Sequence, residues 1–293
     1  MKGANFPMNT TEKLALLRAE MKKRSIDAYV VVTDDFHASE YVGAHFKSRE
    51  FLSGFTGSAG TLVVLPESAL WTDGRYILQA SQQLDGSGIA LMRMGEAGVP
   101  EIPDFLRDHV GENGFIGFDS RTISNDFARR IGEKTREKHI RFAGDEDLVD
   151  LVWTDRPALS CEPLWELEPK FAGYTRAEKL EKVREKMAEL GADVFVIPAL
   201  DEIAWLLNLR GGDVLYTPVF LSYLLLERGK ATLCVQKEAV SAEIETHLAA
   251  DGVKLAPYDD IYALVAALPQ GTRVLLDGER ANYRITQLLG GRI

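Results

Sequence analysis

The chain has 293 residues, of which 46% are hydrophobic and 27% are charged, so it can bury packed cores and is not a disordered segment. Its formal net charge of −10 argues against nucleic acid and anionic membranes as partners, because both attract clustered Lys and Arg. Its apolar runs are far shorter than the ~20 residues that a membrane-spanning helix needs. The widely separated Cys161 and Cys234 and an N-terminus without an apolar signal segment predict a cytoplasmic protein.

The first half of the chain has the pattern of an α/β unit. A helix is predicted from about Thr11, because Leu14, Leu17 and Met21 are spaced to lie on one helical face. The apolar run 28–32 that follows has the length of a buried strand. The further elements predicted in this half are strands 61–65 and 69–72, a helix 76–84, a strand 115–119 and a helix 124–138.

The second half repeats the pattern of the first. At one constant offset, Glu12 aligns with Glu178 and Met21 with Met187, and each segment reads as an amphipathic helix followed by a buried strand. The elements predicted in this half are a helix from residue 177, strands 194–197, 220–227, 231–235 and 273–277, and a helix 281–289. Two such units predict two similar α/β domains, each a mixed β-sheet flanked by helices.

A connector separates the two repeats. The stretch 145–174 contains Pro157, Pro163 and Pro169 and loses the periodic pattern of its neighbours. We therefore place the domain boundary near residue 160. The predicted domains are 1–160, which includes the connector, and 161–293.

A glycine-rich stretch precedes the strand at residue 61. Gly54, Gly57 and Gly60 are spaced three apart, which matches neither the dinucleotide fingerprint nor the phosphate-binding loop. The stretch is no nucleophile elbow, since residue 56 is Thr, and Ser58 has no evident His or Asp partner. The pattern predicts a tight turn in which glycine permits a positive φ or a close backbone approach.

Arg75 is the cation most favourably placed to contact a ligand. Asp73 and Gly74 predict a turn directly after a strand, and Arg75 then stands at the start of a helix. A guanidinium held on such a turn can clamp a carboxylate or a peptide carbonyl. The alternative is a salt bridge within the domain, for example to Asp73 or Glu40, and spacing alone favours this alternative.

The densest group of candidate metal ligands lies just after the first strand. Its spacing fits no standard zinc pattern, and Asp-rich loops of this kind are typical of helix capping. We therefore expect no metal ligand and no catalytic residue in this chain. The group consists of Asp34, Asp35, His37, Glu40 and His45.

Two polar sites in the second half have simple structural explanations. Asp201 and Glu202 open a predicted helix, where acidic side chains suit the helix dipole without acid–base chemistry. Arg210 follows in a polar turn and can face a partner domain or a second subunit.

Six motifs in fixed order resemble the cytosolic, long form of Xaa-Pro aminopeptidase (aminopeptidase P), within the creatinase/prolidase-like metallopeptidases. Any one of them is weak evidence, but the set runs from about Glu12 to Leu289 and is specific. The motifs are HASEY (37–41), SGFTGSAGT (53–61), WTDGRY (71–76), VWTDRP (152–157), ALDEIAWLLNLRG (199–211) and TPVFLSY (217–223).

The resemblance implies two creatinase-like N-terminal domains, followed in such proteins by a "pita-bread" catalytic domain. That domain holds two divalent metal ions, usually manganese, and the enzymes release the N-terminal residue from peptides with proline second. They usually form dimers. The metal ligands would lie beyond Ile293, so we expect this chain alone to be inactive and to hold no cofactor. Arg75, in WTDGRY, matches an N-terminal-domain arginine that contacts substrate in similar enzymes.

The sequence therefore predicts the non-catalytic N-terminal portion of an Xaa-Pro aminopeptidase, with Arg75 as its substrate-binding residue. Its role would be to shape substrate access and to support dimerisation. Its partners would be peptides with proline second, the catalytic domain and a second copy of the chain. The alternative is a free-standing binding module without catalytic activity. A prolidase or creatinase parent is less consistent, because those proteins usually have one such N-terminal domain.

Overall fold

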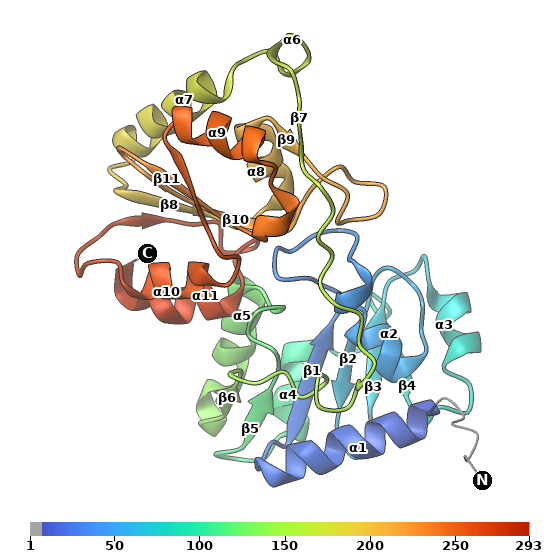
Figure 1. Cartoon of the computed structure of the whole chain (residues 1–293). Coiled ribbons are helices and arrows are strands. Elements are labelled where there is room, and N and C mark those ends of the chain that lie inside the picture. The colour runs from blue at the N-terminus through green and yellow to red at the C-terminus, as the bar shows by residue number, and fades with distance from the viewer. Residues whose placement is uncertain (1–7, 293) are drawn as a thin grey trace. The chain divides into compact units, whose positions relative to one another are not determined.

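The computed structural model describes residues 8–292 and divides them into two compact units (Figure 1). Unit 1 holds the chain up to Thr33 with residues 44–123 and 127–157, and unit 2 holds residues 34–43, 124–126 and those from Ala158 onward. Residues 1–7, part of the stretch in which no signal segment is expected, lie outside the described residues. No helix among the described residues is long and apolar enough to cross a membrane.

Unit 1 is built on a six-stranded mixed sheet with the order β4-β3-β2-β1-β5-β6. The pairs β1/β2 and β2/β3 are antiparallel, and the other three pairs are parallel. The strands are β1 (Ala28–Val32), β2 (Thr61–Val64), β3 (Ala69–Thr72), β4 (Ala90–Arg93), β5 (Phe115–Gly117) and β6 (Arg141–Ala143).

Helices cover both faces of this sheet. The first, α1, is capped at Asn9, whose side chain accepts the N–H of Glu12 while Glu12 accepts the N–H of Asn9. On the other face, Phe105 of α4 packs edge-on against Trp71 of β3, with ring centres 4.8 Å apart. The helices are α1 (Thr10–Lys23), α2 (Ser48–Ser53), α3 (Ile77–Gln83), α4 (Ile102–His109) and α5 (Asn125–Thr135), with short 3₁₀ turns at Ala44–Phe46 and Arg136–Lys138.

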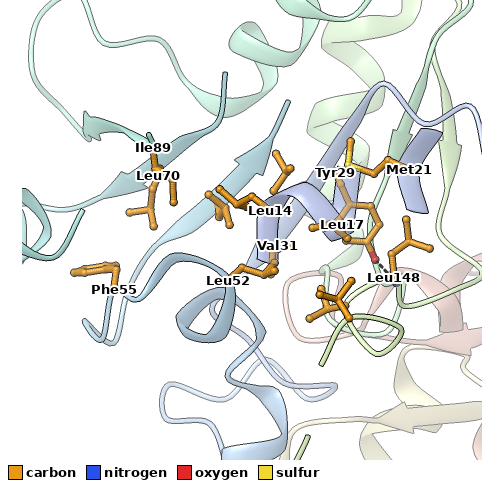
Figure 2. Packing of buried hydrophobic residues seen from close by; sticks show 14 of the residues in the cluster. Leu14, Leu17, Met21, Tyr29, Val31, Leu52, Phe55, Leu70, Ile89 and Leu148 are labelled. Atoms are coloured by element: carbon orange, nitrogen blue, oxygen red, sulfur yellow. Dashed lines mark hydrogen bonds between the residues drawn. The ribbon is translucent and has the colours of Figure 1, made fainter. Parts of the chain in front are cut away.

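The core of unit 1 lies between α1, α2 and the sheet (Figure 2). Leu14, Leu17 and Met21 are buried along α1, as their helical spacing predicts. Tyr29 of β1 packs among them, and its hydroxyl accepts the N–H of Leu148, which ties the later chain to this core (Figure 2).

Unit 2 has a five-stranded mixed sheet with the order β12-β11-β10-β8-β13. The pairs β8/β10 and β10/β11 are antiparallel, whereas β11/β12 and β8/β13 are parallel. Strand for strand this is the order and direction of β4-β3-β2-β1-β5 in unit 1, so the predicted fold class of two similar mixed α/β domains is confirmed. The strands are β8 (Val194–Ile197), β10 (Ser222–Glu227), β11 (Ala231–Val235), β12 (Val253–Ala256) and β13 (Val274–Leu275), and a separate pair joins β7 (Trp165–Glu166) to β9 (Leu209–Arg210).

The helices of unit 2 are capped like those of unit 1 and also cover both faces of the sheet. Helix α7 is capped at Thr175 by the same reciprocal bonds with Glu178 that Asn9 and Glu12 make for α1. Figure 1 shows α7, α8 and α9 on one side of the sheet, with α10 and α11 on the other. The helices are α6 (Pro169–Ala172), α7 (Arg176–Glu189), α8 (Leu200–Leu207), α9 (Ala242–Ala250), α10 (Asp260–Ala266) and α11 (Tyr283–Leu289), with 3₁₀ turns at Lys237–Ala239 and Gly290–Arg292.

Candidate functional site

The glycine-rich loop of unit 1 is a tight turn between α2 and β2, as predicted. Gly54 ends α2 in the left-handed conformation, with φ of +73°. A Cβ on Gly57 would lie 2.3 Å from the ring of Phe55 and 2.9 Å from that of Tyr76, so only glycine fits there. At Gly60 a Cβ would lie 3.0 Å from the carbonyl oxygen of Trp71. The loop is therefore shaped by close packing as well as by backbone freedom.

A buried arginine stabilises this loop by hydrogen bonds to its carbonyl groups. Arg49 of α2 donates from Nη1 to the carbonyl of Phe55 at 2.6 Å, from Nη2 to that of Gly57, and from Nε to Thr33 Oγ1 at 2.6 Å. Its guanidinium also lies 4.7 Å from the ring centre of Phe55. Burial lowers the pKa of Arg49 to about 10, so it stays protonated at neutral pH. Sequence reasoning missed Arg49, because only its position just before the glycine-rich stretch sets it apart.

Arg75 lies in the turn between β3 and α3. Its Nε donates to Asp73 Oδ1 at 3.0 Å and its Nη2 to Asp73 Oδ2 at 2.8 Å, while its main-chain N–H donates to Oδ1 at 3.0 Å. The guanidinium carbon lies 5.2 Å from the ring centre of Tyr76. These bonds from Arg75 lower the pKa of Asp73. The predicted salt bridge is thus present, and its partner is Asp73, while 65% of the Arg75 side chain remains exposed.

Polar contacts join the loop to the turn and to α3. The hydroxyls of Ser58 and Tyr76 lie 2.6 Å apart, and Gln83 Oε1 accepts the N–H of Thr56 at 2.9 Å. The hydroxyl of Thr56 accepts from Gln79 Nε2 at 2.8 Å. The hydroxyl of Ser58 is thus bonded to a phenol and not to the His or carboxylate base of a catalytic triad, so this arrangement is suited to binding and orienting a ligand.

The structure divides the predicted group of candidate metal ligands between the two units, with His37 in unit 2 and His45 in unit 1. His37 is buried: its Nδ1 lies 2.9 Å from the carbonyl oxygen of Pro198, and its Nε2 lies 2.5 Å from the hydroxyl of Tyr258. Because a carbonyl only accepts, Nδ1 carries the hydrogen and Nε2 accepts from the phenol. Burial lowers the pKa of His37.

The remaining members of that group do not complete a metal site. Asp35 Oδ1 accepts the N–H groups of His37 and Ser39, but no helix begins at these residues, so the expected helix-capping role is wrong and Asp35 instead stabilises a turn of the loop. His45 Nδ1 lies 2.8 Å from the carbonyl oxygen of Pro157. Among residues 8–292, no group of three or more His, Cys, Asp or Glu side chains is arranged to hold a metal ion. The described residues therefore do not fit a metal pair.

The two polar sites of the second half take local roles in unit 2. Asp201 and Glu202 lie in the first turn of α8, as predicted. Arg210 donates from Nη1 to the carbonyl oxygens of Ala204 and Leu209, at 2.7 and 2.8 Å. A contact of Arg210 with a partner domain or subunit stays a prediction.

Two family models match the chain, and both describe the creatinase/prolidase N-terminal domain. One matches residues 13–151 and the other residues 155–293, so together they account for nearly the whole sequence. The chain belongs to the creatinase/prolidase N-terminal domain family. Within this family it is the N-terminal region of an Xaa-Pro aminopeptidase type of protein, which confirms the resemblance seen in the six motifs.

Relatives of this family place the chain in the first half of longer proteins. It is 41% identical to the probable Xaa-Pro aminopeptidase P of Sordaria macrospora over 97% of this chain and 48% of that relative. It is 39% identical to aminopeptidase P2 of Arabidopsis thaliana over 94% of this chain and 39% of that relative. The chain thus spans about half the length, or less, of the curated relatives it matches.

A solved structure shares the fold across nearly the whole chain. X-prolyl aminopeptidase from Caenorhabditis elegans matches with a TM-score of 0.92 and 31% identity, over 97% of this chain and 49% of that chain. That protein is described as a cytosolic enzyme with a di-nuclear active site.

Proposed function

We propose that this chain is the non-catalytic N-terminal portion of an Xaa-Pro aminopeptidase. The parent reaction is hydrolysis that releases the N-terminal residue from peptides with proline second. One observation carries the proposal: the chain matches X-prolyl aminopeptidase of C. elegans along 97% of its own length but only 49% of that protein. The two metal ions, which we propose to be manganese, then belong to a catalytic domain outside residues 1–293.

Within this division of labour, Arg75 is the residue of this chain that contacts the peptide. Its support is the match of WTDGRY to the family motif and its position on a rigid turn with 65% of the side chain exposed. Unit 1 then shapes access of the substrate through the surface formed by the glycine-rich loop, Arg75 and Tyr76. No residue of this surface performs the hydrolysis.

The test uses the protein encoded by the complete reading frame, loaded with manganese. We expect it to cleave a peptide with proline second, whereas residues 1–293 alone should not. Arg75→Ala should raise KM by about tenfold or more, the usual weight of a hydrogen bond from a charged donor. Arg136→Ala, which removes an exposed cation elsewhere in unit 1, is the matched control and should leave KM unchanged. Cleavage by residues 1–293 alone would contradict the proposal.

The proposal extends to assembly and location. We propose a homodimer in the cytoplasm, and the description of the C. elegans protein as cytosolic supports the location. Light scattering across the micromolar range should give the mass of a dimer for the full-length protein. A monomeric mass at all concentrations would contradict the dimer and leave the peptidase assignment untouched.

A further inference from the structure

The Arg75 turn bears on a question that the sequence leaves open, which is whether Arg75 binds a carboxylate or a peptide carbonyl. Arginine binds a carboxylate most strongly through two parallel N–H groups. The edge formed by Nε and Nη2 is already taken, because both nitrogens donate to Asp73, at 3.0 and 2.8 Å. The main-chain N–H of Arg75 adds a third bond to the same carboxylate, at 3.0 Å. A second carboxylate would have to displace Asp73 from all three donors or bind beside it.

The charge of Asp73 also disfavours a carboxylate ligand at Arg75. Asp73 is ionised, because the hydrogen bonds from Arg75 lower its pKa. The pair is then neutral overall, and an incoming anion meets the field of Asp73 as well as that of Arg75. A main-chain carbonyl carries no net charge, so Asp73 does not repel it, and it needs only one donor.

The surroundings keep the guanidinium in this arrangement. The ring of Tyr76 lies beneath it at 5.2 Å, and the hydroxyl of Tyr76 is bonded to Ser58 at 2.6 Å. Ser58 in turn belongs to the loop whose carbonyl groups are bound by Arg49. Asp73 therefore binds one edge of the Arg75 guanidinium, and the ring of Tyr76 packs against its face.

We propose that Asp73 is a specificity-determining residue, which makes Arg75 a contact for a main-chain carbonyl of the peptide and not for its C-terminal carboxylate. The inference rests on the proposed substrate role of Arg75. The ligand class is a peptide whose chain continues past the residue at Arg75. Free acids, C-terminal amides and longer peptides are then held equally well by this contact.

The experiment combines substitution of the protein with substitution of the substrate. The full-length, manganese-loaded enzyme is assayed on the tripeptide Ala-Pro-Ala as the free acid and as the C-terminal amide. Four forms are compared: the unsubstituted enzyme, Arg75→Ala, Asp73→Asn and the double variant. Asparagine at position 73 keeps an oxygen that can accept the main-chain N–H of Arg75, so the turn is preserved while the charge is lost.

The ratio of the KM for the free acid to the KM for the amide in the unsubstituted enzyme, where Asp73 balances the charge of Arg75, is the reference, and Asp73→Asn should lower this ratio about threefold to tenfold. With Asn at position 73, Arg75→Ala should raise KM about threefold to tenfold more for the free acid than for the amide, because the cation, no longer balanced by a carboxylate at position 73, attracts the free acid. The control is Asp85→Asn, which removes an exposed carboxylate of unit 1 and should not alter the ratio between acid and amide.

Two results would overturn the inference while leaving the proposed function standing. One is a ratio of the two KM values that Asp73→Asn leaves unchanged. The other is an equal effect of Arg75→Ala on both substrates in the Asp73→Asn background. A different result, in which Arg75→Ala changes neither substrate in either background, would remove the substrate role of Arg75 and this inference with it.

Discussion

Units 1 and 2 share one strand order but present different surfaces at the same edge of the sheet. In unit 1 the turn after β3 carries Arg75, whose side chain is 65% exposed. In unit 2 the corresponding turn after β11 is bonded to the connector: the carbonyl of Ala239 accepts the N–H of Leu164 at 2.9 Å, and Gln236 Nε2 donates to the carbonyl of Ser160. The duplicated scaffold therefore supplies the same edge twice, and the connector covers one of the two.

The loops that precede the second strand differ in the same way. Both α2 and α8 end in a left-handed residue, Gly54 in unit 1 and Asn208 in unit 2. In unit 2, Asp213 then accepts the N–H of Glu162 from the connector at 2.9 Å, so this loop serves to bind the connector. In unit 1 the loop is bound by Arg49 from within the unit. A repeated fold can thus leave one copy of a surface exposed and use the other for internal packing.

The largest effects should come from the two cores. Leu62 of β2 and Leu224 of β10 lie in equivalent strands and are fully buried. We expect Leu62→Ala and Leu224→Ala each to lower the free energy of unfolding by about 2–5 kcal/mol, because each leaves a cavity in a close-packed core. Urea titration followed by circular dichroism measures the loss.

Alkylation of the Cys234 thiol in unit 2 distinguishes destabilisation of unit 2 by Leu224→Ala from destabilisation of unit 1 by Leu62→Ala. Burial raises the pKa of the Cys234 thiol to about 12 and shields it, so it should resist alkylation while unit 2 is folded, whereas the exposed Cys161, whose pKa is also raised, should react without unfolding. Leu224→Ala should bring labelling of Cys234 at a lower urea concentration, and Leu62→Ala should not. This expectation assumes that the two units unfold separately. An equal shift in the urea concentration of Cys234 labelling in both variants would contradict it.

The buried arginines should be the next most sensitive positions. Arg49→Met should lower the free energy of unfolding by about 2–4 kcal/mol, because the buried carbonyl groups of Phe55 and Gly57 lose a charged donor. Thermal or urea unfolding of the 293-residue chain measures this. Arg49→Lys should recover part of the loss, since one ammonium can reach fewer of these acceptors.

The matched variant in unit 2 is Arg176→Met. Arg176 is also buried, and it binds Glu166 at 2.6 Å, Asp251 at 2.8 Å and the buried carbonyl of Leu207 at 2.8 Å. Both carboxylates keep about a third of their side chains exposed, at 31% and 32%, so water can replace their lost partner, and one buried carbonyl loses its charged donor, against two in the case of Arg49. We expect a smaller loss of about 1–2 kcal/mol. A loss equal to that of Arg49→Met would show that exposure of the partners does not decide the cost.

The glycines of the two loops give a finer comparison. Gly57→Ala should cost about 1–3 kcal/mol of stability, since the added methyl group would overlap the rings of Phe55 and Tyr76. Gly212→Ala in unit 2 should change stability by less than about 0.5 kcal/mol, because its Cβ would lie 3.4 Å from Glu162, an ordinary contact. A cost at Gly212 as large as that at Gly57 would contradict this account.

The smallest effect is a pH dependence confined to unit 2. Burial lowers the pKa of His37, so the folded protein keeps it neutral while the unfolded chain binds a proton near pH 6.5. The contribution of neutral His37 to the free energy of unfolding is therefore complete above about pH 6.5. It is lost as the pH falls below that value, by at most about 1.4 kcal/mol per pH unit. Tyr223 and Tyr258 contact the ring, and the charge of Asp35 raises the pKa of His37 against the larger effect of burial.

The pH effect can be separated from other titrations by His37→Gln. This variant should be less stable at pH 7.5, and its free energy of unfolding should change less between about pH 7.5 and 5.5. Labelling of Cys234 in urea reports unit 2 at each pH. An unchanged slope in the variant would show that another group carries the pH dependence.

The predictions from sequence were most accurate in the central strands. Strands β1, β3, β8 and β11 have the bounds that their continuous apolar runs predict, because strands inside a covered sheet bury both faces. Strands β4, β6 and β12 were not predicted. They lie at sheet edges and are partly exposed, so their side chains follow no continuous apolar run.

The candidate site could be predicted only in part. The turn at Asp73 and Gly74 and the tight loop at Gly57 follow from local residue chemistry. The choice of Asp73 over Glu40 as the partner of Arg75 does not, because residue spacing alone cannot rank two candidate carboxylates. The assignment of residues 34–43 to unit 2 was also not predicted, and it places His37 and His45 in different units despite their closeness in sequence.

The sequence by itself determined the local segments, the duplication and the family, since apolar runs, capping residues and ordered motifs act over short stretches of chain. The tertiary structure alone decided which distant groups meet: Arg49 with the loop carbonyls, His37 with Tyr258, and the connector with the turn after β11. The physical reason is that a hydrogen bond requires two groups to lie about 3 Å apart, and packing of the whole unit sets that distance.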